Sequence, residues 1–184
     1  MNRRHHALPR VWMLTDERQG DALWNAVARL PRGAGVVVRH YSWPEEERHA
    51  LARRLARRGL FVAFSGSEAA ARRVGAQAVY GAERRRGLLP RLFPVHNRAE
   101  IVAAERAGAA LLLLSPVFPT RSHPGAGALG PLRFGLLARA ARTPVIGLGG
   151  MTSRRFRRLW GLGADGWAAI DGWLGNETGR PNPL

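Results

Sequence analysis

The feature of this sequence that most constrains its fold is a series of eight short apolar runs separated by amphipathic stretches. The runs are VWMLT (11–15), GVVVR (35–39), FVAFS (61–65), AVYG (78–81), LFPVH (92–96), LLLLSPV (111–117), PVIGLG (144–149) and GWAAI (166–170). Each run is almost continuously apolar rather than alternating, which is typical of strands covered on both faces in a parallel sheet. The stretches between them are rich in Ala, Leu and Arg and suit helices. The sequence therefore predicts a chain of βα units.

Such alternation fits either a doubly wound sheet or a closed (β/α)8 barrel. A G-x-G-x-x-G stretch after the first strand would favour the doubly wound sheet, but TDERQG (15–20) stands there instead. We therefore predict a single, compact α/β TIM barrel. Pro44 is expected to begin one helix and Thr152-Ser153 to cap another, whereas the connection near 82–91 leaves room for only a short helix.

The 184 residues suit one domain. We expect a basic extension over 1–10, the barrel over 11–174 and a loose tail over 175–184. No apolar run approaches the roughly 18–20 residues of a membrane span, and no signal-peptide core follows the basic start. The absence of cysteine excludes disulfides, thiolate zinc sites and cysteine nucleophiles. A soluble, cytoplasmic protein is expected.

All 29 basic Lys/Arg residues are arginine, and the net charge is +16. The absence of lysine excludes Schiff-base chemistry, because a guanidinium does not become a nucleophilic amine. A positive charge suits phosphate-bearing partners. Many arginines lie on expected helices such as 48–59 and 152–160 and are not interleaved with aromatic residues. We therefore expect a small phosphorylated metabolite as the partner, rather than nucleic acid or a membrane; a homodimer is left open.

In a barrel of this type the chemistry lies at the carboxyl ends of the strands. Gly149 and Gly150 end the seventh strand, where backbone N–H groups can approach an anion closely, and the helix near Thr152 follows. The alternative is that the glycines only permit the turn. Asp171 and Gly172 end the eighth strand; the carboxylate of Asp171 weakens anion binding unless it faces away or meets an arginine.

The sixth strand is followed by SPVFPTRSHPG (115–125). The hydroxyls of Ser115, Thr120 and Ser122 and the guanidinium of Arg121 suit phosphate oxygens. His123 can transfer protons near neutral pH. Because Ser, Thr, Pro and Gly are also common in plain turns, that interpretation stays open.

Three further residues stand at the expected rim. His96 ends the fifth strand, and Arg39 and His40 follow the second. We assign Arg39, His40 and His123 as candidate catalytic residues and His96 as a candidate substrate-binding residue. A structural histidine and a surface arginine are the alternatives.

Several motifs of this sequence resemble those of the thiamine phosphate synthase and thiazole tautomerase (TenI-like) family of (β/α)8 barrels. VHNRAEIVAAERAGAALLLLSPVFPT (95–120) is similar to that family's "S-x-H, then E, A and G-A-D, then G-P-V-F-x-T". TPVIGLGG (143–150) and GADGWAAI (163–170) resemble its "I-P-V-x-A-I-G-G … G-A-x-G-x-A" ending. VWMLTDERQG (11–20) resembles its opening "Y-x-I-T-D" strand.

The resemblance implies an enzyme of thiamine biosynthesis that joins thiazole phosphate to aminopyrimidine pyrophosphate and releases pyrophosphate. It assigns the thiazole phosphate to Thr120, Ser122, Gly149 and Gly150 and places His123 where the family has a pyrophosphate-binding lysine. It also implies Mg²⁺, which together with basic residues would stabilise the leaving pyrophosphate.

The first half departs from the family pattern. VVRHYSW (37–43) replaces "Q-x-R-x-K", Ser65-Gly66 replaces "N-D", and YGAERRR (80–86) replaces "H-L-G-x-x-D", so both usual magnesium aspartates are absent. Pro116 stands at the position of the tautomerase histidine, and Asp171 replaces a serine of the last phosphate loop.

These departures leave two functions open. In the first, Arg39, Arg84 and Arg121 replace the lost lysine and magnesium charge in a working synthase. In the second, the chain is a catalytically divergent TenI-like paralogue that binds a phosphorylated ligand, or acts on another substrate, without synthase activity.

Overall fold

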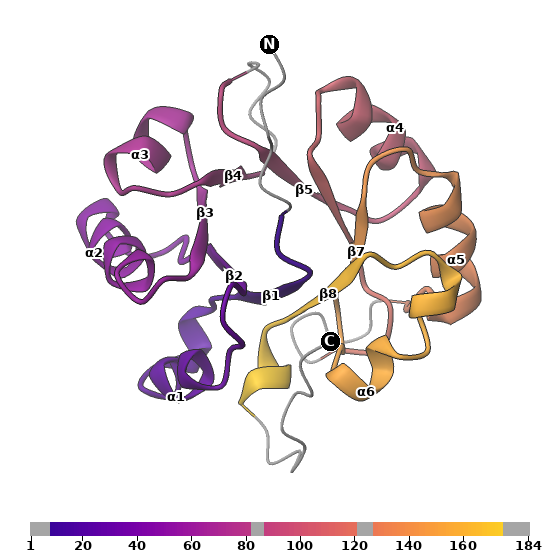
Figure 1. Cartoon of the computed structure of the whole chain (residues 1–184), viewed down its shortest axis with the longest axis horizontal. Coiled ribbons are helices and arrows are strands. Elements are labelled where there is room, and N and C mark those ends of the chain that lie inside the picture. Colours follow the sequence, from indigo (N-terminus) through magenta and orange to yellow (C-terminus); the bar gives the residue numbers. More distant parts are fainter. Residues whose placement is uncertain (1–7, 82–86, 121–126, 175–184) are drawn as a thin grey trace.

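The computed structural model describes residues 8–81, 87–120 and 127–174, which form a closed barrel of eight parallel strands in sequential order (Figure 1). The strands are β1 (Val11–Leu14), β2 (Gly35–Val38), β3 (Phe61–Ser65), β4 (Ala78–Tyr80), β5 (Arg91–Val95), β6 (Leu111–Leu114), β7 (Val145–Gly147) and β8 (Gly166–Ala169). Seven of the eight apolar runs contain one strand each, and the remaining one, 92–96, overlaps β5, which begins one residue earlier at Arg91. The predicted (β/α)8 barrel is confirmed.

Helices surround the barrel (Figure 1). They are α1 (Ala22–Ala28), α2 (Glu45–Ala56), α3 (Glu68–Arg73), α4 (Arg98–Arg106), α5 (Gly130–Ala140) and α6 (Ser153–Phe156), with 3₁₀ turns η1 (Glu17–Gln19), η2 (Trp160–Leu162) and η3 (Asp171–Trp173). Pro44 precedes α2, and the Thr152 hydroxyl caps α6, as predicted. Within the described ranges, no helix is both long and apolar enough to cross a membrane.

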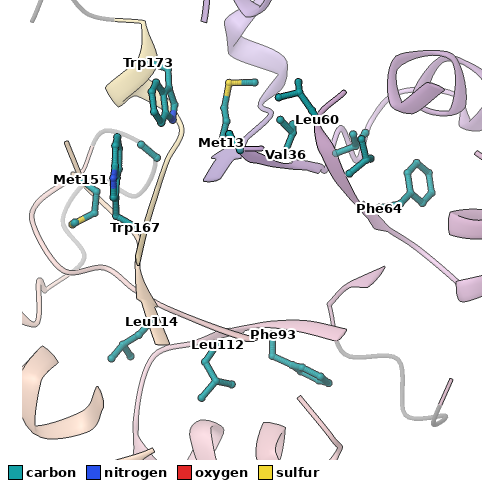
Figure 2. Packing of buried hydrophobic residues seen from close by; sticks show 14 of the residues in the cluster. Met13, Val36, Leu60, Phe64, Phe93, Leu112, Leu114, Met151, Trp167 and Trp173 are labelled. Atoms are coloured by element: carbon teal, nitrogen blue, oxygen red, sulfur yellow. The ribbon is translucent and has the colours of Figure 1, made fainter. Parts of the chain in front are cut away.

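The core has two layers because successive side chains of a strand point to opposite faces. Residues such as Trp12, Val37 and Leu113 fill the barrel interior. A larger cluster lies between strands and helices; Figure 2 shows Leu112 and Leu114 of this cluster pointing away from the barrel axis. Burial of these apolar surfaces is the main favourable contribution to the fold.

A stacked tryptophan pair anchors the last two loops of the barrel. The rings of Trp167 in β8 and Trp173 in η3 lie 4.8 Å apart at 16°, and the Trp173 Nε1–H donates to the Trp12 carbonyl at 3.3 Å. Met151, which follows β7, is buried in the same cluster beside Trp167 (Figure 2). This packing fixes the segments that carry Gly149, Gly150 and Gly172.

Candidate site at the barrel mouth

Polar residues continue the inward-facing series of several strands past their carboxyl ends. Leu14, Val37, Ala63, Leu92 and Leu113 face the barrel interior. Every second residue of a strand lies on the same face, so the same series continues past the strand ends into the residues of the mouth. These residues are Asp16, Arg39, Ser65, His96 and Ser115. The parallel strands bring their carboxyl ends to one end of the barrel, so these residues belong to one rim.

Asp16 connects the loops after β1, β2 and β8. Its Oδ2 accepts a hydrogen bond from Arg39 Nη2 at 2.8 Å, and its Oδ1 accepts one from Arg18 Nε at 2.7 Å. Arg18 Nη2 also lies 3.8 Å from Asp171 Oδ1. Burial acts to raise the pKa of Asp16, but the hydrogen bonds and charge of Arg18, with the bond from Arg39, outweigh it and lower the pKa. Arg39 is thereby fixed at the rim with a carboxylate partner.

His40 does not join Arg39 at the open mouth. Its side chain is only 1% exposed, its Nδ1 lies 3.0 Å from Thr15 Oγ1, and its ring lies 4.1 Å from that of Trp43. Burial lowers the pKa of His40 more than the neighbouring carboxylates of Glu17 and Asp16 raise it. The structure therefore places His40 as a buried residue that packs against Thr15 and Trp43, and its catalytic role stays a prediction from the sequence.

The loops after β6 and β7 pack directly on each other. The N–H groups of Val117 and Phe118 donate to the carbonyls of Leu148 and Gly149 at 2.9 and 3.1 Å. Gly149 and Gly150 have φ of +91° and +58°, and a Cβ on Gly150 would lie 2.5 Å from the Pro119 carbonyl oxygen. Glycine is thus required here by backbone conformation and close approach, whether or not an anion binds.

Gly172 and Asp171 complete this side of the rim. A Cβ on Gly172 would lie 2.5 Å from the Met151 carbonyl oxygen, so the β8 loop packs tightly on the β7 loop. The Asp171 carboxylate meets Arg18, which offsets its negative charge. The α6 helix has only four residues, so its dipole contributes little to the site.

His96 and Ser115 lie together on neighbouring strands. The His96 Nδ1 is 2.8 Å from the Ser115 carbonyl oxygen, which can only accept, so Nδ1 carries the proton and Nε2 remains for a ligand. Thr120 follows in the same loop as Ser115. Three predicted site residues, Arg121, Ser122 and His123, and also Arg84, lie outside the described residues.

Two arginines at the rim were missed by the sequence analysis. Arg48 of α2 donates from Nη2 to the Ser65 carbonyl, and its Nε is buried without a partner. Arg155 of α6 donates from Nη1 to the Gly150 carbonyl. The rim location of Arg155 could have been predicted from its position in the first helical turn after the glycine pair. The rim location of Arg48 could not, because it depends on how α2 packs against the barrel.

The described residues do not present the oxygen ligands that Mg²⁺ prefers. Within the described part of the chain, no group of three or more His, Cys, Asp or Glu residues could hold a metal ion. Asp16 is engaged by two arginines, and the ends of β3 and β4 carry Ser65, Gly66 and Gly81. The described residues at the mouth therefore do not fit Mg²⁺.

The fold and the polar rim define a (β/α)8 barrel protein with a candidate ligand site at its carboxyl-terminal mouth. Residues 93–172 match the family model TMP-TENI, described as thiamine monophosphate synthase. The second half of the chain is thus similar to this thiamine phosphate synthase family, in the region where the motifs at 95–120, 143–150 and 163–170 resemble it.

Curated relatives match in part of their length. The thiamine-phosphate synthase of Methanosarcina barkeri (strain Fusaro / DSM 804) is 35% identical over 77 residues, which are 41% of this chain and 35% of the relative. That of Pyrococcus furiosus is 30% identical over 86 residues, 47% and 42% of the two chains. The chain thus spans less than half the length of these relatives.

Solved structures support the fold over nearly the whole chain. Thiamine phosphate pyrophosphorylase from Pyrococcus furiosus superposes with a TM-score of 0.73 at 22% identity, covering 94% of this chain and 90% of the other. The enzyme of the same name from Bacteroides thetaiotaomicron gives 0.62 at 11% identity, covering 89% and 83%. At these identities the likeness concerns the fold alone.

Proposed function

We propose that the protein is a cytoplasmic, thiamine phosphate synthase-like transferase of thiamine biosynthesis. It would join thiazole phosphate to aminopyrimidine pyrophosphate and release pyrophosphate. The observation that carries this proposal is the direct packing of the 115–120 loop on the glycine pair Gly149 and Gly150, because both segments lie within the region that matches the family model.

In this proposal the thiazole phosphate binds between the loops after β6 and β7. Thr120 and the backbone N–H groups at Gly149 and Gly150 contact its oxygens, with Arg121 and Ser122 assigned from the sequence alone. Ser115, His96 and Gly172 line the same rim. These contacts orient the thiazole nitrogen toward the second substrate.

The reaction itself needs charge stabilisation rather than a nucleophilic side chain. The C–O bond to pyrophosphate breaks with its electron pair leaving on oxygen, and the thiazole nitrogen forms the new C–N bond. Guanidinium groups stabilise the departing negative charge. Arg39 is held at the rim by Asp16 for this role, and Arg84, Arg121 and His123 are further candidates from the sequence.

A second candidate function is ligand binding without synthase turnover. It is favoured by the ion pair of Arg39 with Asp16, which already offsets the positive charge that the pyrophosphate would need. The described residues also offer no carboxylate set for magnesium. In this case the chain would be a divergent paralogue that retains the phosphate loop.

One experiment separates the two candidates. Purified protein is incubated with both phosphorylated substrates, with and without Mg²⁺, and thiamine phosphate is measured by fluorescence after oxidation. The synthase proposal predicts product above the protein-free blank. Calorimetric binding of thiazole phosphate without product supports the second candidate. If the protein neither binds thiazole phosphate nor forms product, both candidate functions are rejected.

A further inference from the structure

We propose that Arg155 is an additional phosphate-binding residue at the loops after β6 and β7. This inference rests on the proposed function, because it names a cation for the same site. Arg155 is the third residue of α6 and is exposed to solvent. Its Nη1 donates to the Gly150 carbonyl, and its Cζ lies 5.0 Å from the centroid of the Phe118 ring.

These contacts hold the guanidinium over the loop rather than in free solvent. The Arg155 backbone N–H donates to Thr152 Oγ1 at 3.2 Å, which fixes the first turn of α6. The Arg155 side chain is then restrained by the Gly150 carbonyl, which lies in the loop after β7, and by the Phe118 ring, which lies in the loop after β6. A side chain restrained before binding loses less conformational entropy when a ligand arrives.

The guanidinium retains donors for a ligand. Arginine has about five N–H donors in a planar fork that matches phosphate oxygens. Among the described residues, one hydrogen bond from the Arg155 side chain is present, the bond to Gly150. The remaining edge of the fork can contact the phosphate that the glycine pair approaches.

Arg155 differs from Arg18 and Arg39 in how its positive charge is balanced. Arg39 and Arg18 share the Asp16 carboxylate, and Arg18 also meets Asp171. No acidic residue in the described ranges forms an ion pair with Arg155. Arg155 therefore adds positive charge at the phosphate loop and selects phosphorylated over unphosphorylated ligands.

The test compares Arg155→Met with Arg154→Met. Both residues are exposed arginines of α6, but Arg154 has no hydrogen bond or ring contact to the loops in the described structure. Each protein is titrated calorimetrically with thiazole phosphate, with the unphosphorylated thiazole alcohol and with inorganic phosphate. Thermal unfolding verifies that the variants are folded, and Arg155→Lys tests whether charge alone is sufficient.

We expect Arg155→Met to weaken thiazole phosphate binding by about tenfold to a hundredfold, the usual effect of a lost charge-assisted hydrogen bond. Arg154→Met should change the affinity for thiazole phosphate by less than about threefold. Arg155→Lys should recover part of the loss, and binding of the alcohol should not change.

Equal affinities of the Arg155→Met and Arg154→Met proteins for thiazole phosphate overturn the inference. If the wild type binds inorganic phosphate through Arg155 but not thiazole phosphate, the inference stands and the proposed function fails. If the wild type binds neither inorganic phosphate nor thiazole phosphate, the inference and the proposed function are both rejected.

Discussion

At the scale of single residues, Asp16 organises the charges of the mouth. Its two oxygens accept hydrogen bonds from Arg18 and Arg39, and Arg39 is only 17% exposed. A buried or half-buried cation without its carboxylate is costly, so this pairing stabilises the rim. It also sets the direction in which Arg39 presents its guanidinium to a ligand.

Replacing Asp16 by asparagine should lower the free energy of unfolding by about 1–3 kcal/mol at pH 7, because Arg39 loses its charge partner. The lowered pKa of Asp16 in the folded protein means that its carboxylate stabilises the fold above the unfolded value of about 3.9. That contribution disappears as the pH falls through the lower folded value. Urea unfolding at pH 7 and pH 3 measures the difference between wild type and Asp16→Asn.

Asp21→Asn is the matched control, because Asp21 precedes α1 with no side-chain capping bond and is exposed. Its effect should stay within about 0.5 kcal/mol at both pH values. A destabilisation by Asp16→Asn that is equally large at pH 3 would contradict the electrostatic account of Asp16.

At the scale of elements, the site depends on how closely the loops after β6 and β7 approach each other. Backbone hydrogen bonds join Val117 to Leu148 and Phe118 to Gly149, and there is no room for a Cβ on Gly150 beside the Pro119 carbonyl. The tryptophan stack of Trp167 and Trp173 supports the neighbouring loop after β8. The geometry offered to a phosphate is therefore a property of packed loops rather than of one side chain.

Gly150→Ala should destabilise the protein by about 1–2 kcal/mol from its left-handed conformation alone, and the clash with Pro119 adds to this. It should also weaken thiazole phosphate binding, since the loop must move. Chemical unfolding and calorimetry measure the two effects. The control is Gly161→Ala, where a Cβ meets nothing within 4 Å. If the two alanine variants were equally stable, the close approach of the loops would not be the reason for glycine at 150.

At the scale of the whole molecule, the barrel was predictable because each of the eight strands lies in an almost continuous apolar run. The parallel order of the strands and the carboxyl-end rim follow from that alternation. The directions of the side chains at the rim could not be predicted from that alternation. His40 was expected to lie at the rim together with Arg39. Its side chain instead points outward from the barrel, as that of Val38 does, and is buried against Thr15 and Trp43. Arg155 and Arg48 reach the rim only because their helices pack where they do.

The net charge of +16 acts on the same scale, because it favours anionic ligands in general. Specific binding must therefore be distinguished from attraction to the whole surface. A ligand held by the packed loops should bind with one site per chain, whereas attraction to the whole surface should be weak and should disappear as salt increases.

The most direct measurement of the central claim is a calorimetric titration of the protein with thiazole phosphate and with the unphosphorylated alcohol, in EDTA and at about physiological salt. Because the described residues hold Asp16 in ion pairs and offer no magnesium ligand set, phosphate binding should not need a metal. We predict saturable binding of thiazole phosphate at one site per chain and much weaker binding of the alcohol. Equal affinity for the two ligands, or binding of thiazole phosphate only when Mg²⁺ is added, would contradict a phosphate site built from the loops after β6 and β7.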